Sequence, residues 1–128
     1  MGLRTLSVIN DVCQQLKINI DEIDPHDKSI YASLVCLDSP QGLFQIEAEI
    51  NFKVCQLIKP QNLEQLSAVI AIGRPGALDF KDYYAAYVRT GESQSVHDFF
   101  DDILSYTGGI PLYQEQLMKM AVKVGFSL

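Results

Sequence analysis

Residues 44–54 read FQIEAEINFKV, and apolar side chains alternate there with polar and charged ones. An alternation with period two gives a β-strand one apolar face and one solvated face. The apolar residues continue to Ile58, which is too long a run for one straight strand. We therefore expect the chain to turn near residues 49–51 and to form a meander of antiparallel strands.

Two further segments favour strands. Residues 29–37 are rich in β-branched and aromatic side chains, and five residues with turn chemistry follow them at 38–42. Residues 77–90 allow two interpretations. Their aromatic content and the following Gly91 favour two short strands, whereas on a helix Tyr83, Tyr84, Tyr87 and Val88 would share one face.

Helical periodicity appears in four other places. Apolar residues recur at steps of three and four over residues 3–17, 62–72, 95–107 and 111–124. Asn62 is a candidate N-cap for the second of these helices, and Gln65 stands at the capping-box position. Gly73 and the Pro75-Gly76 pair are expected to end that helix.

The order of these elements predicts an α+β fold. We expect helix, three strands, helix, two strands and helix, which makes an antiparallel sheet of about five strands with helices packed on one face. An extra helix would follow Pro111. The length of 128 residues suits a single domain spanning residues 1–128.

Composition excludes several classes of protein. The chain has 16 acidic and 10 basic residues, a net charge of −6, which argues against nucleic-acid binding because phosphate backbones attract clustered cations. The three cysteines have neither disulfide nor zinc spacing. No apolar run is long enough to span a membrane and no signal peptide is visible, so a cytoplasmic protein with reduced thiols is expected.

No motif of known chemistry is present, and we predict no catalytic, cofactor-binding or metal-binding residue. His97 with the acidic residues at 98, 101 and 102 could hold a metal, but carboxylates at a helix start explain the same pattern. The acidic loop 21–27 lacks the spacing of a calcium loop. Residues 73–76 lack the spacing of a phosphate-binding loop and are better explained as a helix end.

The tyrosine cluster is the most informative surface candidate. Tyr83, Tyr84 and Tyr87 carry large amphipathic rings of the kind that protein interfaces favour. If their segment is a strand, one of its faces points away from the core and is free for a partner. A second layer of helices covering that face is the alternative.

The order of elements resembles the type III secretion chaperones and the wider superfamily of that fold, which includes YbjN-like proteins. The first helix would be Leu3–Leu16, the meander Ser29–Ile58 and the middle helix Asn62–Gly73. The last strands would lie in Ala77–Arg89 and the closing helix in Ser95–Tyr106. The resemblance covers most of the chain but concerns layout only, since that superfamily has no invariant motif.

The resemblance implies a protein-binding module that is not an enzyme and uses no cofactor. It would hold a partner polypeptide on an apolar surface of the sheet and first helix, through the tyrosine cluster in our interpretation. It would form a homodimer through the middle helix, at Leu63, Leu66, Val69 and Ile70. The alternative is a small-ligand-binding or enzymatic domain whose pocket lies near Tyr83, Tyr87 and His97.

Overall fold

The computed structural model describes residues 4–127. Within this range the chain forms seven α-helices and four short 3₁₀ helices, and it contains no β-strand. The α-helices are α1 (Arg4–Leu16), α2 (Lys28–Val35), α3 (Glu49–Ile58), α4 (Leu63–Ile72), α5 (Lys81–Thr90), α6 (Asp101–Leu104) and α7 (Gln114–Lys123). The 3₁₀ helices are η1 (Ile20–Glu22), η2 (Leu78–Phe80), η3 (Asp98–Phe100) and η4 (Ser105–Thr107).

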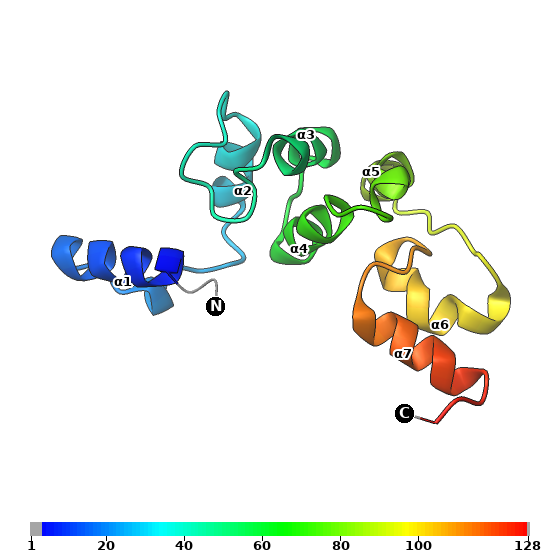
Figure 1. Ribbon diagram of the computed structural model, residues 1–128. Coiled ribbons are helices and arrows are strands. Elements are labelled where there is room, and N and C mark those ends of the chain that lie inside the picture. The colour runs from blue at the N-terminus through cyan, green and yellow to red at the C-terminus, as the bar shows by residue number, and fades with distance from the viewer. Residues whose placement is uncertain (1–3, 128) are drawn as a thin grey trace.

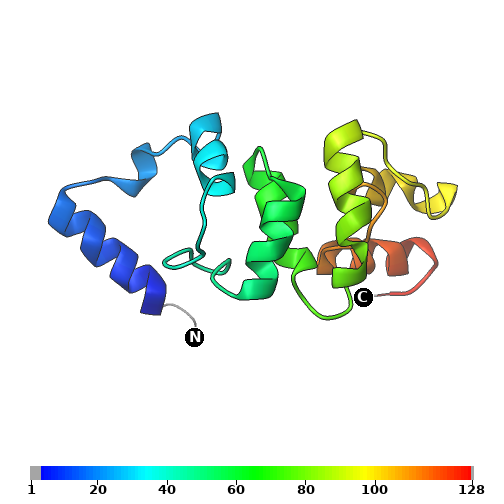
Figure 2. The same cartoon turned by 90° about the horizontal axis from the view of Figure 1, so that it is seen from above.

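The helices are arranged along an extended, curved path. α1 lies at one end, α2 to α5 form the centre, and α6 and α7 lie at the other end (Figure 1). The view from above shows the same order, with α1 separated from the centre by the segment that contains η1 (Figure 2). The closest packing between α-helices is that of α3 against α4 and α5, and of α6 against α7.

The hydrophobic core lies at the centre of this path. It is built mainly from side chains of α3, α4 and α5, and segments before α3 and before α7 add to it. Its buried members are Ile46, Phe52, Val54, Cys55, Ile58, Ala68, Val69, Ile72, Tyr84, Ala85 and Ile110. The central helices α3, α4 and α5 therefore bury their apolar faces against one another, and the core is built from helices alone with their flanking turns.

The predicted α+β fold is wrong, and the alternating stretch 44–54 shows why. A turn occupies residues 44–46, and α3 begins at Glu49. On α3 the buried Phe52, Cys55 and Ile58 are three residues apart, which is the spacing of one helix face. Ile50 is 45% exposed, although the predicted strand placed it on the same buried face as Phe52. Residues four apart share a face in both a strand and a helix, so a short alternation fits both structures.

Residues 29–37 also form a helix instead of the predicted strand. Asp27 is the N-cap of α2, and its carboxylate accepts a hydrogen bond from the Ser29 backbone N–H at 2.9 Å. The Tyr31 hydroxyl donates to the Pro25 carbonyl and so ties α2 to the loop before it. The Asp27 cap was the sequence signal for a helix, but it lies within an acidic stretch that was interpreted only as a loop.

The predicted strands of residues 77–90 are wrong, and the helical alternative is confirmed. Residues 78–80 form η2 and residues 81–90 form α5, which ends at Gly91 with φ of 73°. That left-handed conformation favours glycine and is typical of a helix end. The glycine that suggested the end of a strand therefore marks the end of a helix.

The four helical segments predicted from period 3.6 are confirmed as α1, α4, α7 and the η3–α6–η4 run. The Asn62 side chain accepts from the Gln65 backbone N–H at 2.8 Å, so the predicted N-cap is also confirmed. Leu3, predicted to belong to the first helix, lies outside the described residues, as do the other residues at the two ends of the predicted domain 1–128.

Candidate functional site

A cleft between α4 and α7 brings polar groups together from three separate segments. We call it the α4–α7 cleft; its volume is about 330 Å³. Gln45 enters it from the turn before α3, Arg74 from the turn after α4, and Gln114 and Glu115 from the first turn of α7. Its remaining lining residues are Ser67, Ile70, Ala71, Leu112 and Tyr113.

A close contact between α3 and the end of α4 positions Arg74. A Cβ atom at Gly73 would lie 1.7 Å from the Asn51 side-chain oxygen, so a larger residue there would force the Asn51 side chain to move. The Asn51 side-chain amide also donates to the Gln45 carbonyl at 2.9 Å. Asn51 therefore bonds to the segment that carries Gln45 and packs closely against the end of α4, which precedes Arg74.

Arg74 is exposed and takes part in none of the ion pairs found among residues 4–127. A guanidinium group presents several N–H donors in a plane and binds carboxylates and phosphates in a bidentate manner. The cleft can therefore accept an anionic group at Arg74. In the sequence, residues 73–76 fit a helix end, and no local signal marks Arg74 as a candidate.

A buried glutamine sets the first turn of α7 against the cleft. Gln116 is 1% exposed, and its side-chain oxygen accepts from the backbone N–H groups of Leu112 and Tyr113, each at 2.9 Å. Its amide nitrogen donates to the Thr107 hydroxyl oxygen at 2.7 Å. Thr107 is buried too, and its hydroxyl lies 2.7 Å from the Ile110 carbonyl. Every polar atom of these two side chains thus has a partner, which is the condition for a stable buried network.

Sequence reasoning did not single out Thr107 or Gln116. The available signal was a capping box, because Gln116 follows the N-cap Tyr113 by three residues and bonds back to its N–H. A capping box predicts where a helix starts, but it gives no information about burial.

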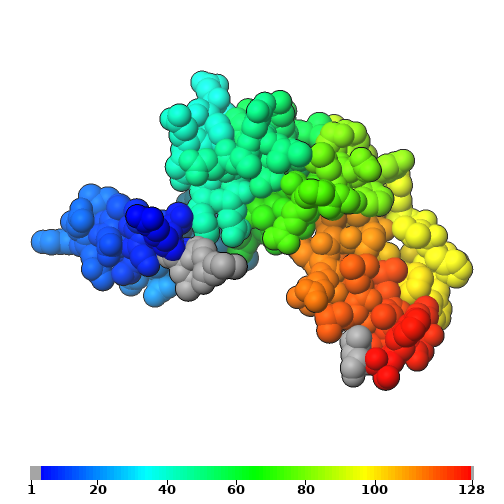
Figure 3. Space-filling model, viewed as in Figure 1, coloured from blue at the N-terminus to red at the C-terminus, as the bar shows by residue number. Residues whose placement is uncertain are grey.

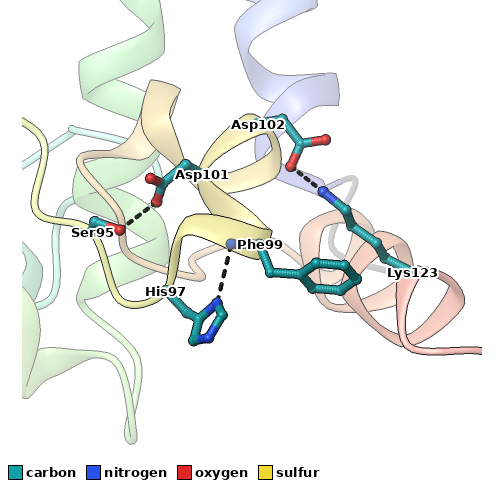
Figure 4. Close-up of polar contacts among 6 residues, drawn as sticks. All are labelled: Ser95, His97, Phe99, Asp101, Asp102 and Lys123. Carbon is teal, nitrogen blue, oxygen red and sulfur yellow. Dashed lines mark hydrogen bonds and ion pairs between the residues drawn. The ribbon is translucent and has the colours of Figure 1, made fainter.

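Two of the acidic residues around η3 and α6, Asp101 and Asp102, bond to other side chains of this chain. The Ser95 hydroxyl donates to Asp101 at 2.7 Å, and the Lys123 ammonium group donates to Asp102 at 2.6 Å (Figure 4). The His97 imidazole accepts from the Phe99 backbone N–H at 3.1 Å and so caps η3. The hydrogen bond from Lys123 lowers the pKa of Asp102. In the described part of the chain, no group of three or more His, Cys, Asp or Glu side chains is arranged to hold a metal ion.

The predicted tyrosine cluster is divided between core and surface. Tyr83 is 52% exposed, whereas Tyr84 is 2% exposed and its burial raises the pKa of its hydroxyl above the usual range. Tyr87 packs its ring 5.7 Å from that of Tyr84, and its hydroxyl donates to the Tyr106 carbonyl at 3.4 Å. The three rings thus do not form one continuous exposed surface, and their role in partner binding stays a prediction.

The predicted dimer stripe on α4 packs mostly within its own chain. Val69 is fully buried, and Leu66 and Ile70 are partly buried against the core. Leu63 is 55% exposed. The dimer role of this stripe also stays a prediction.

The described residues contain no helix that is both long and apolar enough to cross a membrane.

Comparison with known proteins gives a consistent result. The family model described as "Bacterial DNA polymerase III alpha subunit finger domain" matches residues 5–128. A relative from Halalkalibacterium halodurans, named DNA polymerase III subunit alpha, is 33% identical over 136 residues that cover 100% of this chain. Proteins of the same name from Thermotoga maritima and Staphylococcus aureus are each 33% identical over 127 residues, covering 99% and 94% of this chain. No solved structure matches the chain.

The chain spans only 12–14% of the length of these relatives. The match nevertheless overturns the resemblance to type III secretion chaperones, which rested on an order of helices and strands that the structure lacks in residues 4–127. The predicted chaperone-like function is therefore wrong, and the ligand-pocket alternative gains no support. The prediction that the protein is not an enzyme is also wrong, because its relatives are named as DNA polymerase subunits and so belong to an enzyme family. The chain belongs to the family of the finger domain of the bacterial DNA polymerase III alpha subunit.

Proposed function

We propose that this chain is the finger part of a DNA polymerase III alpha subunit and works on DNA during replication in the bacterial cytoplasm. The observation that carries this proposal is the family match over residues 5–128, together with relatives that share one name. In this proposal residues 1–128 act as a single domain.

The α4–α7 cleft supports the proposal chemically. A polymerase handles phosphate groups, and Arg74 offers a guanidinium group without an ion-pair partner among the described residues. Tyr113 and Gln114 add hydrogen-bonding groups to the same cleft. We propose that the cleft contacts a phosphate-bearing substrate or an anionic group of a neighbouring part of the polymerase.

This proposal changes the expected partners. The net charge of −6 argued against nucleic acid, but a net charge sums the whole surface and does not show where the cations lie. The peptide client and the homodimer were implied by the resemblance to secretion chaperones and lose that basis. DNA and other replication proteins take their place as proposed partners.

The test is to recover the protein that carries this sequence from its native cell and to measure DNA synthesis on a primed template. We expect template-dependent synthesis by the recovered protein or by a complex that contains it. Recovery of a protein without synthesis above that of a mock purification would overturn the proposal.

Arg74→Ala tests the cleft in the same assay. We expect synthesis to fall by about 10- to 100-fold, because a lost charge-assisted hydrogen bond is worth about 1.5–3 kcal/mol. Arg4→Ala is the matched control, because it removes the same charge from the distant helix α1. Equal activity of the two variants would show that Arg74 has no special role.

A further inference from the structure

Two adjoining hollows on α2, α3 and α5 gather positive charge. The first has a volume of about 420 Å³ and contains Lys28 and Lys59, while the second has about 500 Å³ and contains Lys59 and Arg89. Both hollows also share Gln61. The three cations thus belong to one continuous surface, which we call the basic surface.

The basic surface departs from the charge of the rest of the chain. Acidic residues outnumber basic ones by 16 to 10, yet no Asp or Glu lines either hollow. The three ion pairs among residues 4–127 use Lys53, Lys81 and Lys123 and leave the three cations of the basic surface unpaired. Asp27 is the neighbour of Lys28 in sequence, but its carboxylate bonds to Ser29.

Packing of the central helices places these cations together. Lys59 is the C-cap of α3 in the left-handed conformation, with φ of 54°, and the buried Pro60 follows it. Arg89 lies in the last turn of α5, and α5 packs directly against α3. Lys28 enters from the first turn of α2.

Helix electrostatics explains only part of this arrangement. Cations near the C-terminal ends of helices are favourable, which suits Lys59 and Arg89. Lys28 stands at a helix N-terminus, where the dipole disfavours a cation, so its position has no local explanation. All three side chains are exposed and can reach a ligand.

We propose that Lys28, Lys59 and Arg89 form a binding surface for the phosphate backbone of nucleic acid. The proposal rests on the proposed polymerase function, which makes nucleic acid a more suitable polyanion here than an acidic protein. Binding would come from charge and from hydrogen bonds donated by lysine, arginine and the Gln61 amide, without recognition of base sequence.

The test compares two triple variants of the full chain by fluorescence anisotropy with labelled single-stranded and duplex DNA at several salt concentrations. One variant carries Lys28→Gln, Lys59→Gln and Arg89→Gln. The control carries Lys17→Gln, Lys53→Gln and Lys119→Gln, which changes the net charge by the same amount at residues outside both hollows. Circular dichroism checks that both variants fold as the wild type does.

We expect the first variant to bind DNA at least tenfold more weakly at low salt. The slope of log affinity against log salt concentration should also become shallower by about 2–3, because each lost phosphate contact removes about 0.7–0.9. The control should keep the wild-type slope. Equal loss in both variants, or no binding by the wild type, would overturn the proposal. Equal competition by polyglutamate of matched charge would assign the surface to an acidic protein instead.

The two proposals fail in different ways. Suppose that the recovered protein synthesises DNA and that the first variant binds DNA as the wild type does. The proposal of a basic surface would then be wrong, and the proposed polymerase function would stand. Suppose instead that the first variant loses DNA binding and that the recovered protein synthesises no DNA. The proposal of a basic surface would then stand, and the proposed polymerase function would be wrong.

Discussion

The centre of the molecule and its N-terminal arm carry similar apolar stripes but use them differently. On α4, Val69 and Ile72 are fully buried, whereas α1 buries none of its residues. Leu6 and Val12 on α1 are each 46% exposed. In the space-filling view, α1 and the segment after it form a lobe beside the centre (Figure 3). The comparison shows that an amphipathic stripe predicts a helix and does not predict what the helix packs against.

The difference also concerns what stabilises each region. The core helices α3, α4 and α5 are each ten residues long, and helices of that length are marginal in water without tertiary packing. Burial of side chains such as Val69 and Tyr84 supplies that packing. α1 has thirteen residues, which is still a marginal length, and none of them is buried.

The same substitution in the two regions gives the largest expected effect. Val69→Asp places a carboxylate at a position that is fully buried, and we expect the free energy of unfolding to fall by roughly 3–5 kcal/mol. Val8→Asp on α1, where the side chain is 54% exposed, should change it by less than about 0.5 kcal/mol. Urea unfolding followed by circular dichroism measures both. Similar losses in the two variants would show that α1 belongs to the same packed unit.

Gly73→Ala tests the contact on which the centre and the cleft both depend. The added Cβ would meet the Asn51 side-chain oxygen at 1.7 Å, so we expect a loss of about 1–3 kcal/mol in the free energy of unfolding. The double variant Asn51→Ala/Gly73→Ala removes that oxygen and should recover part of the loss relative to the sum of the single variants. Strict additivity of the two single changes would contradict the proposed contact.

Alkaline unfolding gives the smallest effect and concerns a core tyrosine. Burial raises the pKa of Tyr84, so the folded chain keeps this proton to a higher pH than the unfolded chain does. Stability from this group is therefore complete below the ordinary tyrosine pKa of about 10 and is lost as the pH rises above it. Burial raises the pKa of Cys55 as well, which adds a loss of the same sign.

Tyr84→Phe removes the tyrosine contribution. Between pH 9 and pH 11 we expect the melting temperature of this variant to fall less steeply than that of the wild type. The difference between the two slopes should correspond to the loss of one ionisable group. Thermal unfolding at a series of pH values measures the two slopes. Parallel slopes would show that the Tyr84 hydroxyl does not ionise on unfolding in this range.

Local signals in the sequence were sufficient for some elements. The helices α1, α4 and α7 follow from apolar residues at steps of three and four, and Asn62 marks the start of α4. These signals are local because a cap and a helix face involve residues only a few positions apart. The same reasoning failed for α2, α3 and α5, where short segments rich in aromatic and β-branched residues satisfy the patterns of both a strand and a helix.

Local signals in the sequence could not predict the candidate site, because its residues lie far apart in the chain. Gln45, Arg74 and Gln114 follow one another at intervals of about thirty to forty residues, and they meet only because the folded chain brings their three segments to one cleft. Each of these residues is unremarkable in its own segment. Lys28, Lys59 and Arg89 are separated by similar intervals, so their grouping on one surface could not be predicted from composition.

The amino-acid sequence by itself determined where four of the helical segments lie, how α4 is capped, and, through comparison with relatives, the family of the chain. Only the tertiary structure decided that residues 28–35, 49–58 and 81–90 are helices and that α1 remains uncovered. The physical reason is that short apolar segments gain most of their stability from burial against distant residues. That burial depends on which faces meet in the folded chain.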